Sequence, residues 1–148
     1  MNRLNNTLLL LGCPELPAQT GIALYLANKL ARKNVDVTIA GTRSAINLIK
    51  VSDPERNYAK KLIDLDRCIE NIAEKRTDFD SCFVFIHNDA GIAYLATIHS
   101  ISKADLSAII FGSNAETLAS TIEFECRKIV AKTAHNPIPL KKKIDEVI

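Results

Sequence analysis

The chain has 148 residues, 47% hydrophobic and 24% charged, a composition typical of one globular domain with its own core. Its formal net charge of +2 is too small to indicate a nucleic-acid partner, and its longest apolar run, at residues 8–11, is far shorter than the ~20 residues that span a bilayer. Because the opening MNRLNNT also lacks a signal-peptide core, we expect a cytoplasmic protein without direct membrane insertion, forming a single domain over residues 1–148.

Five segments have the character of strands buried in a parallel sheet. The first is a short, continuous apolar run, and the second alternates and is rich in β-branched residues. The five strands are predicted at residues 7–11, 35–40, 82–87, 106–111 and 129–133.

Segments with helical spacing of apolar residues separate these strands. The first has Ile22, Leu26 and Leu30 on one face. Helices are predicted at residues 18–33, 41–51, 54 or 58 to 75, 88–101, 112–126 and 140–148. Alternating strands and helices predict an α/β fold, a three-layer α/β/α Rossmann-like domain with a mainly parallel five-stranded sheet.

Polar residues, glycines and prolines gather where the predicted strands end. The first, third and fifth strands lead into GCPELPAQTG, HNDAG and AHNPIP. In parallel sheets, ligands bind at the edge formed by these strand ends. If the three strands are central neighbours, their polar residues face one cleft. The predicted crevice residues are Cys13, Pro14, Glu15, Gln19, Asn88, Asp89, Gly91, His135 and Asn136.

Some of these residues also have a purely structural explanation. Asn88 or Asp89 precedes an apolar helix, where an N-cap alone stabilises by ~1 kcal/mol, and Ser113 and Asn114 are expected to be caps as well. Gly91 falls in the first turn of its helix. Glycine costs ~1 kcal/mol there relative to alanine, so a close backbone approach would explain it.

The four cysteines have different predicted roles. Cys68, Cys82 and Cys126 lie on apolar faces or in a strand and are expected to pack in the core. Cys13 follows the first strand, near the positive end of the next helix, and is either a buried turn residue or an accessible thiol. No Cys-x-x-Cys pair is present, so no metal site is predicted, although a cluster assembled across the fold is left open.

Sequence motifs for catalysis are weak. Gly12 and Gly21 do not form either glycine-rich phosphate loop, so nucleotide binding has no motif behind it. His99 is expected to be structural. His135 precedes two prolines that hold the chain extended and could serve as a base for Cys13, but the spacing alone does not establish the pair. No catalytic residue is assigned.

Several motifs together resemble a family of methanogenic archaea. These are LGCPELPAQ, VSDPERNYAKKLIDLDRC, NDAGIAYL and AHNPIPLKKKID, and the resemblance extends over essentially the whole chain. It implies a Rossmann-like domain with a cytoplasmic role in methanogenesis, and it brings no catalytic residues; His87 lies outside the motifs. The recurring positions are Cys13, Pro14, Glu15, Pro17, Gln19, Asp53, Pro54, Asn88, Asp89, His135, Asn136, Pro137 and Pro139.

Two functions are expected from these observations. The first is a non-catalytic regulatory or accessory module that docks on a larger enzyme of methanogenesis, with the membrane-bound, cobamide-dependent methyltransferase as a candidate host and Cys13 as a redox-sensitive thiol. The alternative is a small enzyme or carrier acting on a nucleotide or one-carbon cofactor, with Asp89 or His135 as acid–base and Cys13 as nucleophile. A protein partner is therefore expected, a small-molecule ligand and a homo-oligomer are left open, and the cofactor is unknown.

Overall fold

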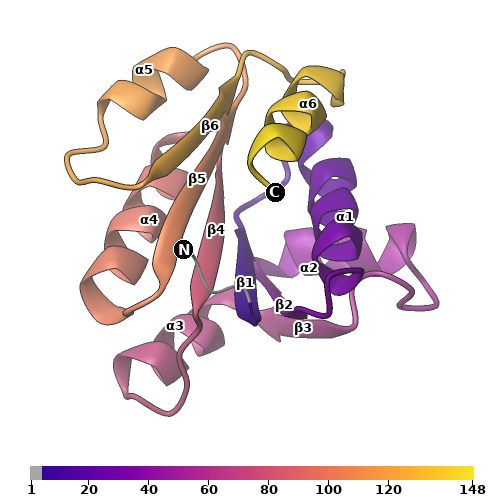
Figure 1. Ribbon diagram of the computed structural model, residues 1–148, viewed down its shortest axis with the longest axis vertical. Helices are drawn as coiled ribbons and strands as arrows, with labels where there is room; N and C mark the ends of the chain where they lie inside the picture. Colours follow the sequence, from indigo (N-terminus) through magenta and orange to yellow (C-terminus); the bar gives the residue numbers. More distant parts are fainter. Residues whose placement is uncertain (1–4) are drawn as a thin grey trace.

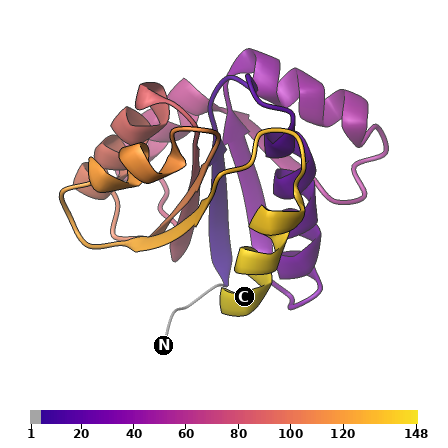
Figure 2. The ribbon, with the colours of Figure 1, turned by 90° about the horizontal axis from the view of Figure 1, so that it is seen from above.

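The computed structural model describes residues 5–148 and places one six-stranded parallel sheet between two layers of helices (Figures 1 and 2). The strands are β1 (Asn6–Leu11), β2 (Asp36–Gly41), β3 (Lys61–Asp64), β4 (Ser81–Ile86), β5 (Asp105–Phe111) and β6 (Arg127–Ala131). The helices are α1 (Ala18–Ala31), α2 (Arg43–Ser52), α3 (Leu65–Ala73), α4 (Asp89–Ile101), α5 (Ala115–Ser120) and α6 (Ile138–Val147). None of these helices is long and apolar enough to cross a membrane. Residues 1–4 lie outside the described residues. The predictions that fall on them, the missing signal-peptide core and the start of the single domain, therefore lie outside them too.

The strand order is β3-β2-β1-β4-β5-β6, with all neighbours parallel. The chain first builds outward from β1 to β3 and then returns to place β4 on the other side of β1. Helices α1, α2 and α6 cover one face of the sheet, and α3, α4 and α5 cover the other. The predicted three-layer α/β/α class is confirmed, with six strands in place of five.

The apolar run in β1 reflects burial on both faces of the sheet. Leu9 and Leu11 pack in the core beneath α1, whereas Leu8 and Leu10 pack in the core beneath α4. Successive strand residues point to opposite faces, so a strand covered by helices on both sides needs apolar residues at every position. β4 follows the same rule, and all six of its residues are buried.

The prediction of one helix from residue 54 or 58 to 75 is wrong. This segment contains a loop, the edge strand β3 and then α3. Asp53, only 4% exposed, shapes the loop, because its carboxylate accepts hydrogen bonds from the backbone N–H groups of Asn57, Tyr58 and Ala59 at 2.8–2.9 Å. β3 then pairs with β2, and Asp64 caps α3 by accepting from Arg67 N at 3.2 Å.

The second half of the chain departs from the prediction in smaller ways. The expected helix over 112–126 is the short α5, and the Asn114 side chain makes no capping hydrogen bond at its start. Cys126 therefore does not extend a helical stripe; it is half-buried in the segment that enters β6. α6 begins at Ile138, two residues before the predicted start at Leu140, directly after Pro137.

Candidate functional site

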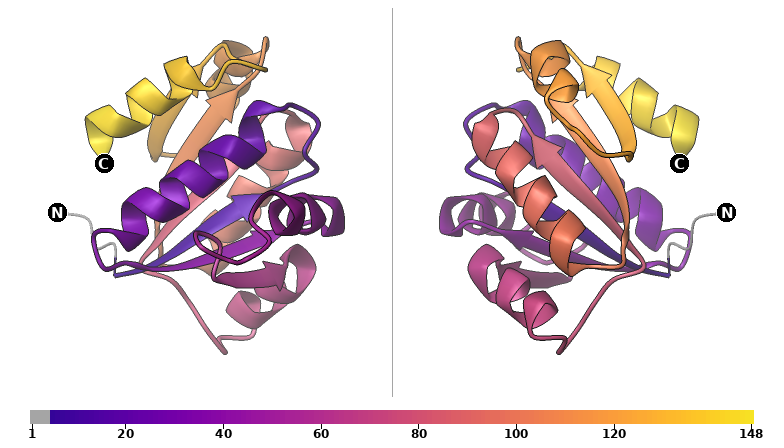
Figure 3. Two further views of the ribbon diagram at one scale, coloured as in Figure 1. Left: turned by 90° about the vertical axis from the view of Figure 1, so that its right-hand side faces the viewer. Right: turned by 90° about the vertical axis from the view of Figure 1, so that its left-hand side faces the viewer.

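The carboxyl ends of β1 and β4 lie side by side, at the point where the strand order reverses. The β1–α1 loop, residues 12–17, passes beside the turn from β4 into α4 (Figure 3). In open α/β sheets the two outgoing connections diverge at this point, and ligands bind beside it. We call the residues around this junction, 12–19, 44 and 87–88, the switch-point crevice.

A hydrogen bond joins the two sides of the crevice. The Asn88 side-chain amide donates to Glu15 Oε1 at 2.6 Å. Asn88 Oδ1 in turn accepts from Gly91 N at 3.2 Å, so the same side chain is the N-cap of α4. A carboxylate acceptor makes the first bond one of the stronger types, and it anchors the β1–α1 loop to the start of α4.

His87 lies beneath this loop with unmet hydrogen-bonding capacity. Its side chain is only 5% exposed, its ring lies 5.2 Å from that of Phe111, and Nε2 is 3.3 Å from Glu15 Oε1. Apart from this contact with Glu15, neither ring nitrogen has a polar partner in residues 5–148. Burial lowers the pKa of His87 below 6.5, and the nearby Glu15 carboxylate opposes this shift only in part. The imidazole is therefore neutral near pH 7.

Gln19 is a second buried side chain with an unused polar atom. It is fully buried in the first turn of α1, and its Nε2 donates to Gly12 O at 2.9 Å, which ties the helix to the end of β1. Its Oε1 has no partner in the described part of the chain. A buried, unpaired polar atom costs ~1–3 kcal/mol, so His87 and Gln19 together mark a costly place in the fold.

The sequence left two possibilities for Cys13, a buried turn residue or an accessible thiol, and the structure shows the accessible thiol. Its side chain is exposed, and its Sγ lies 3.8 Å from the Ser44 hydroxyl in the first turn of α2. Cys68 and Cys82 are buried, and burial raises the pKa of the Cys68 thiol to about 11 and that of Cys82 further. Only the thiol of Cys13 thus combines exposure with a place at the strand ends.

Asp89 and Gly91 lie beside the crevice but do not reach into it. Asp89 is exposed in the first turn of α4, where a carboxylate is favourable near the positive helix end. Gly91 is buried against β4, and a Cβ there would lie 2.9 Å from the Cα of Ile86. The close backbone approach at Gly91 is therefore between helix and strand. Pro14 is half-buried within the β1–α1 loop.

Within residues 5–148, no hydrogen bond, ion pair or ring contact joins the side chains of His135 and Asn136 to the crevice. Their strand, β6, is the edge of the sheet, separated from β1 by β4 and β5, so the expectation of three central neighbours is wrong for it. The loop does reach α1, because Ala134 O accepts from Ala18 N at 2.9 Å. The His135 side chain is exposed, and it makes no polar or ring contact with the crevice in residues 5–148. Asn136 Oδ1 accepts from the backbone N–H of Ile138, the first residue of α6, at 3.1 Å.

Sequence reasoning missed Ser44, which lies beside Cys13 because β2 neighbours β1, whereas only the ends of the first, third and fifth strands were singled out. His87 was expected to face the cleft with the other polar residues of its strand end, yet nothing in the sequence indicates its burial or its contact with Glu15. Among residues 5–148 no group of three His, Cys, Asp or Glu side chains is placed to hold a metal ion.

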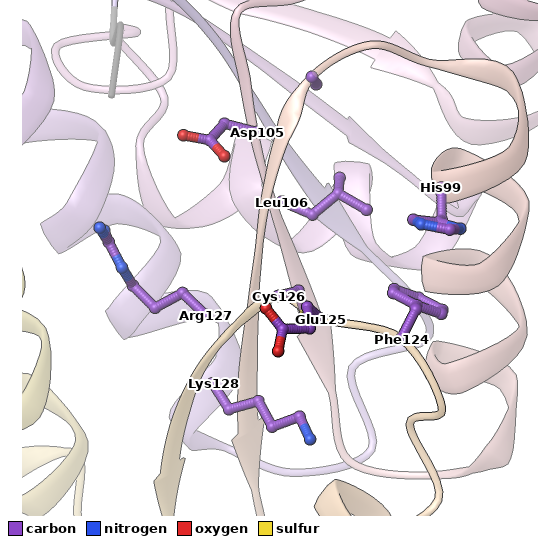
Figure 4. A pocket seen from close by; sticks show the side chains of 9 residues that line it. His99, Asp105, Leu106, Phe124, Glu125, Cys126, Arg127 and Lys128 are labelled. Atoms are coloured by element: carbon purple, nitrogen blue, oxygen red, sulfur yellow. The ribbon is translucent and has the colours of Figure 1, made fainter. Parts of the chain in front are cut away.

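A separate hollow lies at the opposite end of the sheet. It has a volume of about 650 Å³ at the amino ends of β5 and β6, with the His99 and Phe124 rings on one wall (Figure 4). These rings stack at 3.8 Å between centroids with 13° between their planes. None of the predicted crevice residues lines this hollow.

The strand order and the switch-point crevice define a Rossmann-like α/β domain. The family model described as "Domain of unknown function (DUF1890)" matches residues 8–147, and the chain belongs to this family. It is 30% identical over 147 residues to "Uncharacterized protein MJ0452" of Methanocaldococcus jannaschii, covering 97% of each chain. It is also 38% identical to the solved "Structure of MT0777", with a TM-score of 0.88 and 95% of each chain covered. The resemblance to an archaeal family is confirmed.

Proposed function

We propose that the chain is a non-catalytic regulatory or accessory module of methanogenesis, which docks on a larger enzyme complex through the switch-point crevice. One observation carries the proposal: exposed Cys13 shares one end of the sheet with the buried His87 ring and with buried Gln19 Oε1, and within residues 5–148 neither ring nitrogen nor this oxygen has a hydrogen-bond partner. A partner or ligand that offers a donor to Gln19 Oε1 and a polar group to the His87 ring would relieve that cost. Kinship with a protein of Methanocaldococcus jannaschii supports the methanogenic setting.

The surroundings of Cys13 favour binding over catalysis. A catalytic thiol needs a general base within hydrogen-bond reach. The side chain in contact with Cys13 Sγ is the Ser44 hydroxyl at 3.8 Å, which is no general base, and His87 faces Glu15 instead. An exposed thiol remains open to a sulfenic acid or a mixed disulfide. We therefore propose that oxidation of Cys13 changes docking.

Affinity purification from an archaeal host tests the docking proposal. The full tagged chain is recovered from anaerobic cells and from cells exposed to oxygen, in wild-type, Cys13→Ser and Cys126→Ser forms. We expect one defined enzyme complex in the anaerobic wild type, identified by mass spectrometry, with the cobamide-dependent methyltransferase as the first candidate. Oxygen should change recovery for wild type and Cys126→Ser but not for Cys13→Ser. Recovery of the chain alone in every sample contradicts the proposal.

A small enzyme or carrier for a nucleotide is the second candidate function. Its specific support is the order β3-β2-β1-β4-β5-β6, which is that of dinucleotide-binding domains, although the glycine-rich loop is absent. A thermal-shift screen with nucleotides and one-carbon cofactors tests it. A true ligand at about 100 times its dissociation constant adds about 2.7 kcal/mol, which is readily detected as a raised melting temperature. Unchanged melting with every compound removes this candidate.

A further inference from the structure

A second hollow lies between α2 and β3, the edge strand at the opposite side of the sheet from β6. Its volume is about 510 Å³, within the range of small-molecule sites. Three cationic side chains line it, from Arg43, Lys50 and Arg56, together with the Asn47 amide and the Leu62 side chain. We call it the α2–β3 groove.

The positive charges of the groove are not neutralised by ion pairs. None of its three cations forms a salt bridge within residues 5–148. The one carboxylate in its lining, Asp64, already accepts a hydrogen bond from Arg67 N as the cap of α3. The charge of Arg56 also acts on the buried Asp53 carboxylate, which is held by three backbone N–H groups. The lining itself therefore keeps an excess of two positive charges.

The fold fixes the spacing of these cations. Arg43, Asn47 and Lys50 are four and three residues apart, so they lie along one face of α2. Seven residues of helix place Arg43 and Lys50 about 10 Å apart along the axis. Arg56 completes the row from the loop that Asp53 shapes, where its backbone lies in the left-handed region at a φ of 56°. An L-residue is uncommon there, and glycine would be more comfortable.

We propose that the α2–β3 groove binds a small molecule carrying a row of phosphate groups. Arg43 and Arg56 match phosphate oxygens with their planar guanidinium groups, Lys50 adds a point charge between the ends of the row, and Asn47 adds amide hydrogen bonds. Leu62 offers an apolar contact to the carbon skeleton. The site is separate from the switch-point crevice, although Arg43 adjoins Ser44, the neighbour of Cys13.

Titration of the full chain with sodium tripolyphosphate, followed by amide NMR, tests this proposal. We expect saturable shifts in α2, in residues 53–59 and in β3, with weaker binding of orthophosphate. Each phosphate-binding cation should account for about tenfold in affinity. The variants Arg56→Gly and Lys50→Ala should therefore each weaken binding about tenfold, and raising the salt concentration should weaken it further.

Matched control variants remove the same charges elsewhere. Arg32→Ala and Lys142→Ala alter exposed cations at the end of α1 and on α6, and both should leave the affinity within about twofold of wild type. Arg56→Gly also relaxes the left-handed residue, so it removes the guanidinium without threatening the fold. Shifts spread over all basic surfaces, non-saturable binding, or equal affinities for Arg56→Gly and Arg32→Ala would overturn the proposal.

Discussion

The two ends of the β-sheet differ in the kind of surface they present. The amino ends of β5 and β6 border a hollow of about 650 Å³, where the stacked rings of His99 and Phe124 form a wall. The carboxyl ends of β1 and β4 border the switch-point crevice, where buried His87 and Gln19 keep polar atoms without hydrogen-bond partners. The hollow at the amino ends is notable for its volume, and the switch-point crevice is notable for its buried polar atoms.

This difference teaches that volume alone does not mark a site. The amino-end hollow forms where the sheet's edge strand is covered by the short helix α5, a six-residue element that leaves the start of β6 bare. A hollow of this kind needs no functional explanation, because it arises where the covering helix ends before the strand beneath it does. Unpaired buried polar atoms have no such origin, because each lowers the stability of the fold by ~1–3 kcal/mol. The carboxyl end is therefore the place to look for function.

Cysteine labelling should give the largest contrast. In the native protein, Cys13 should react with a thiol reagent at least about a thousandfold faster than Cys82, because a thiol in a central strand becomes accessible only through extensive unfolding. Mass spectrometry after timed quenching measures the rates. Cys13→Ser should abolish the fast phase and Cys126→Ser should retain it. A fast phase that survives Cys13→Ser would break the contrast between the two ends.

Two helical glycines should respond in opposite directions to alanine. Gly91→Ala brings a Cβ to 2.9 Å from the Ile86 backbone, and we expect the free energy of unfolding to fall by about 1–3 kcal/mol. Gly21→Ala, with nothing within 4 Å of its Cβ, should raise it by about 0.5–1 kcal/mol. Urea denaturation measures both. Equal effects would mean that α4 does not pack as closely on β4 as described.

Acidification should reveal the buried His87. Its pKa lies below the ordinary 6.5, so between that lowered value and 6.5 the unfolded chain binds a proton that the folded chain does not. The free energy of unfolding should therefore fall as the pH drops from 7 to 5. Among residues 5–148, the groups in contact with the His87 ring are the Glu15 carboxylate and the Phe111 ring, and Glu15 carries the charge.

Urea denaturation at pH 5, 6 and 7 measures this dependence against the variant His87→Gln. The variant should lose less stability over the same range, and the contributions of His99 and His135 cancel because both proteins contain them. An identical pH dependence in the two proteins would show that His87 is not buried in its neutral form.

The smallest effect is expected at the amino end. His99→Ala removes one ring of the stacked pair and should lower the free energy of unfolding by about 0.5–1.5 kcal/mol. It should not alter the labelling rate of Cys13 or the recovery of a partner complex. A change in either measurement would assign a functional part to the amino-end hollow and reverse the comparison.

The buried strands could be predicted from the sequence and the edge strand could not. β1 and β4 are continuous apolar runs, a pattern caused directly by their burial on both faces. β3 has four residues, and Leu62, Leu65, Ile69 and Ile72 continue helical spacing through it. Its formation depends on Asp53 and on pairing with β2, and both are contacts between residues that the local pattern does not connect.

The candidate site was predictable as a set of strand ends but not as a set of neighbours. Cys13, Glu15 and Asn88 follow strands that do lie together. His135 follows a strand of equal polar content that lies at the sheet's edge, because nothing local specifies where β6 pairs. Strand order arises from packing of the whole chain, so it decides which of several similar turns share a crevice.

The hydrogen bond from Ala18 N to Ala134 O has a consequence for how the protein is made. A ribosome delivers the β1–α1 loop early, but the segments that hold it in place follow much later: first the turn at Asn88, then Gly112, against which Leu16 rests, and last Ala134. Domains acquire structure as their segments emerge during translation. The β1–α1 loop that carries Cys13 therefore stays without these contacts while the intervening segments are synthesised, and the crevice is completed only after Ala134 has emerged.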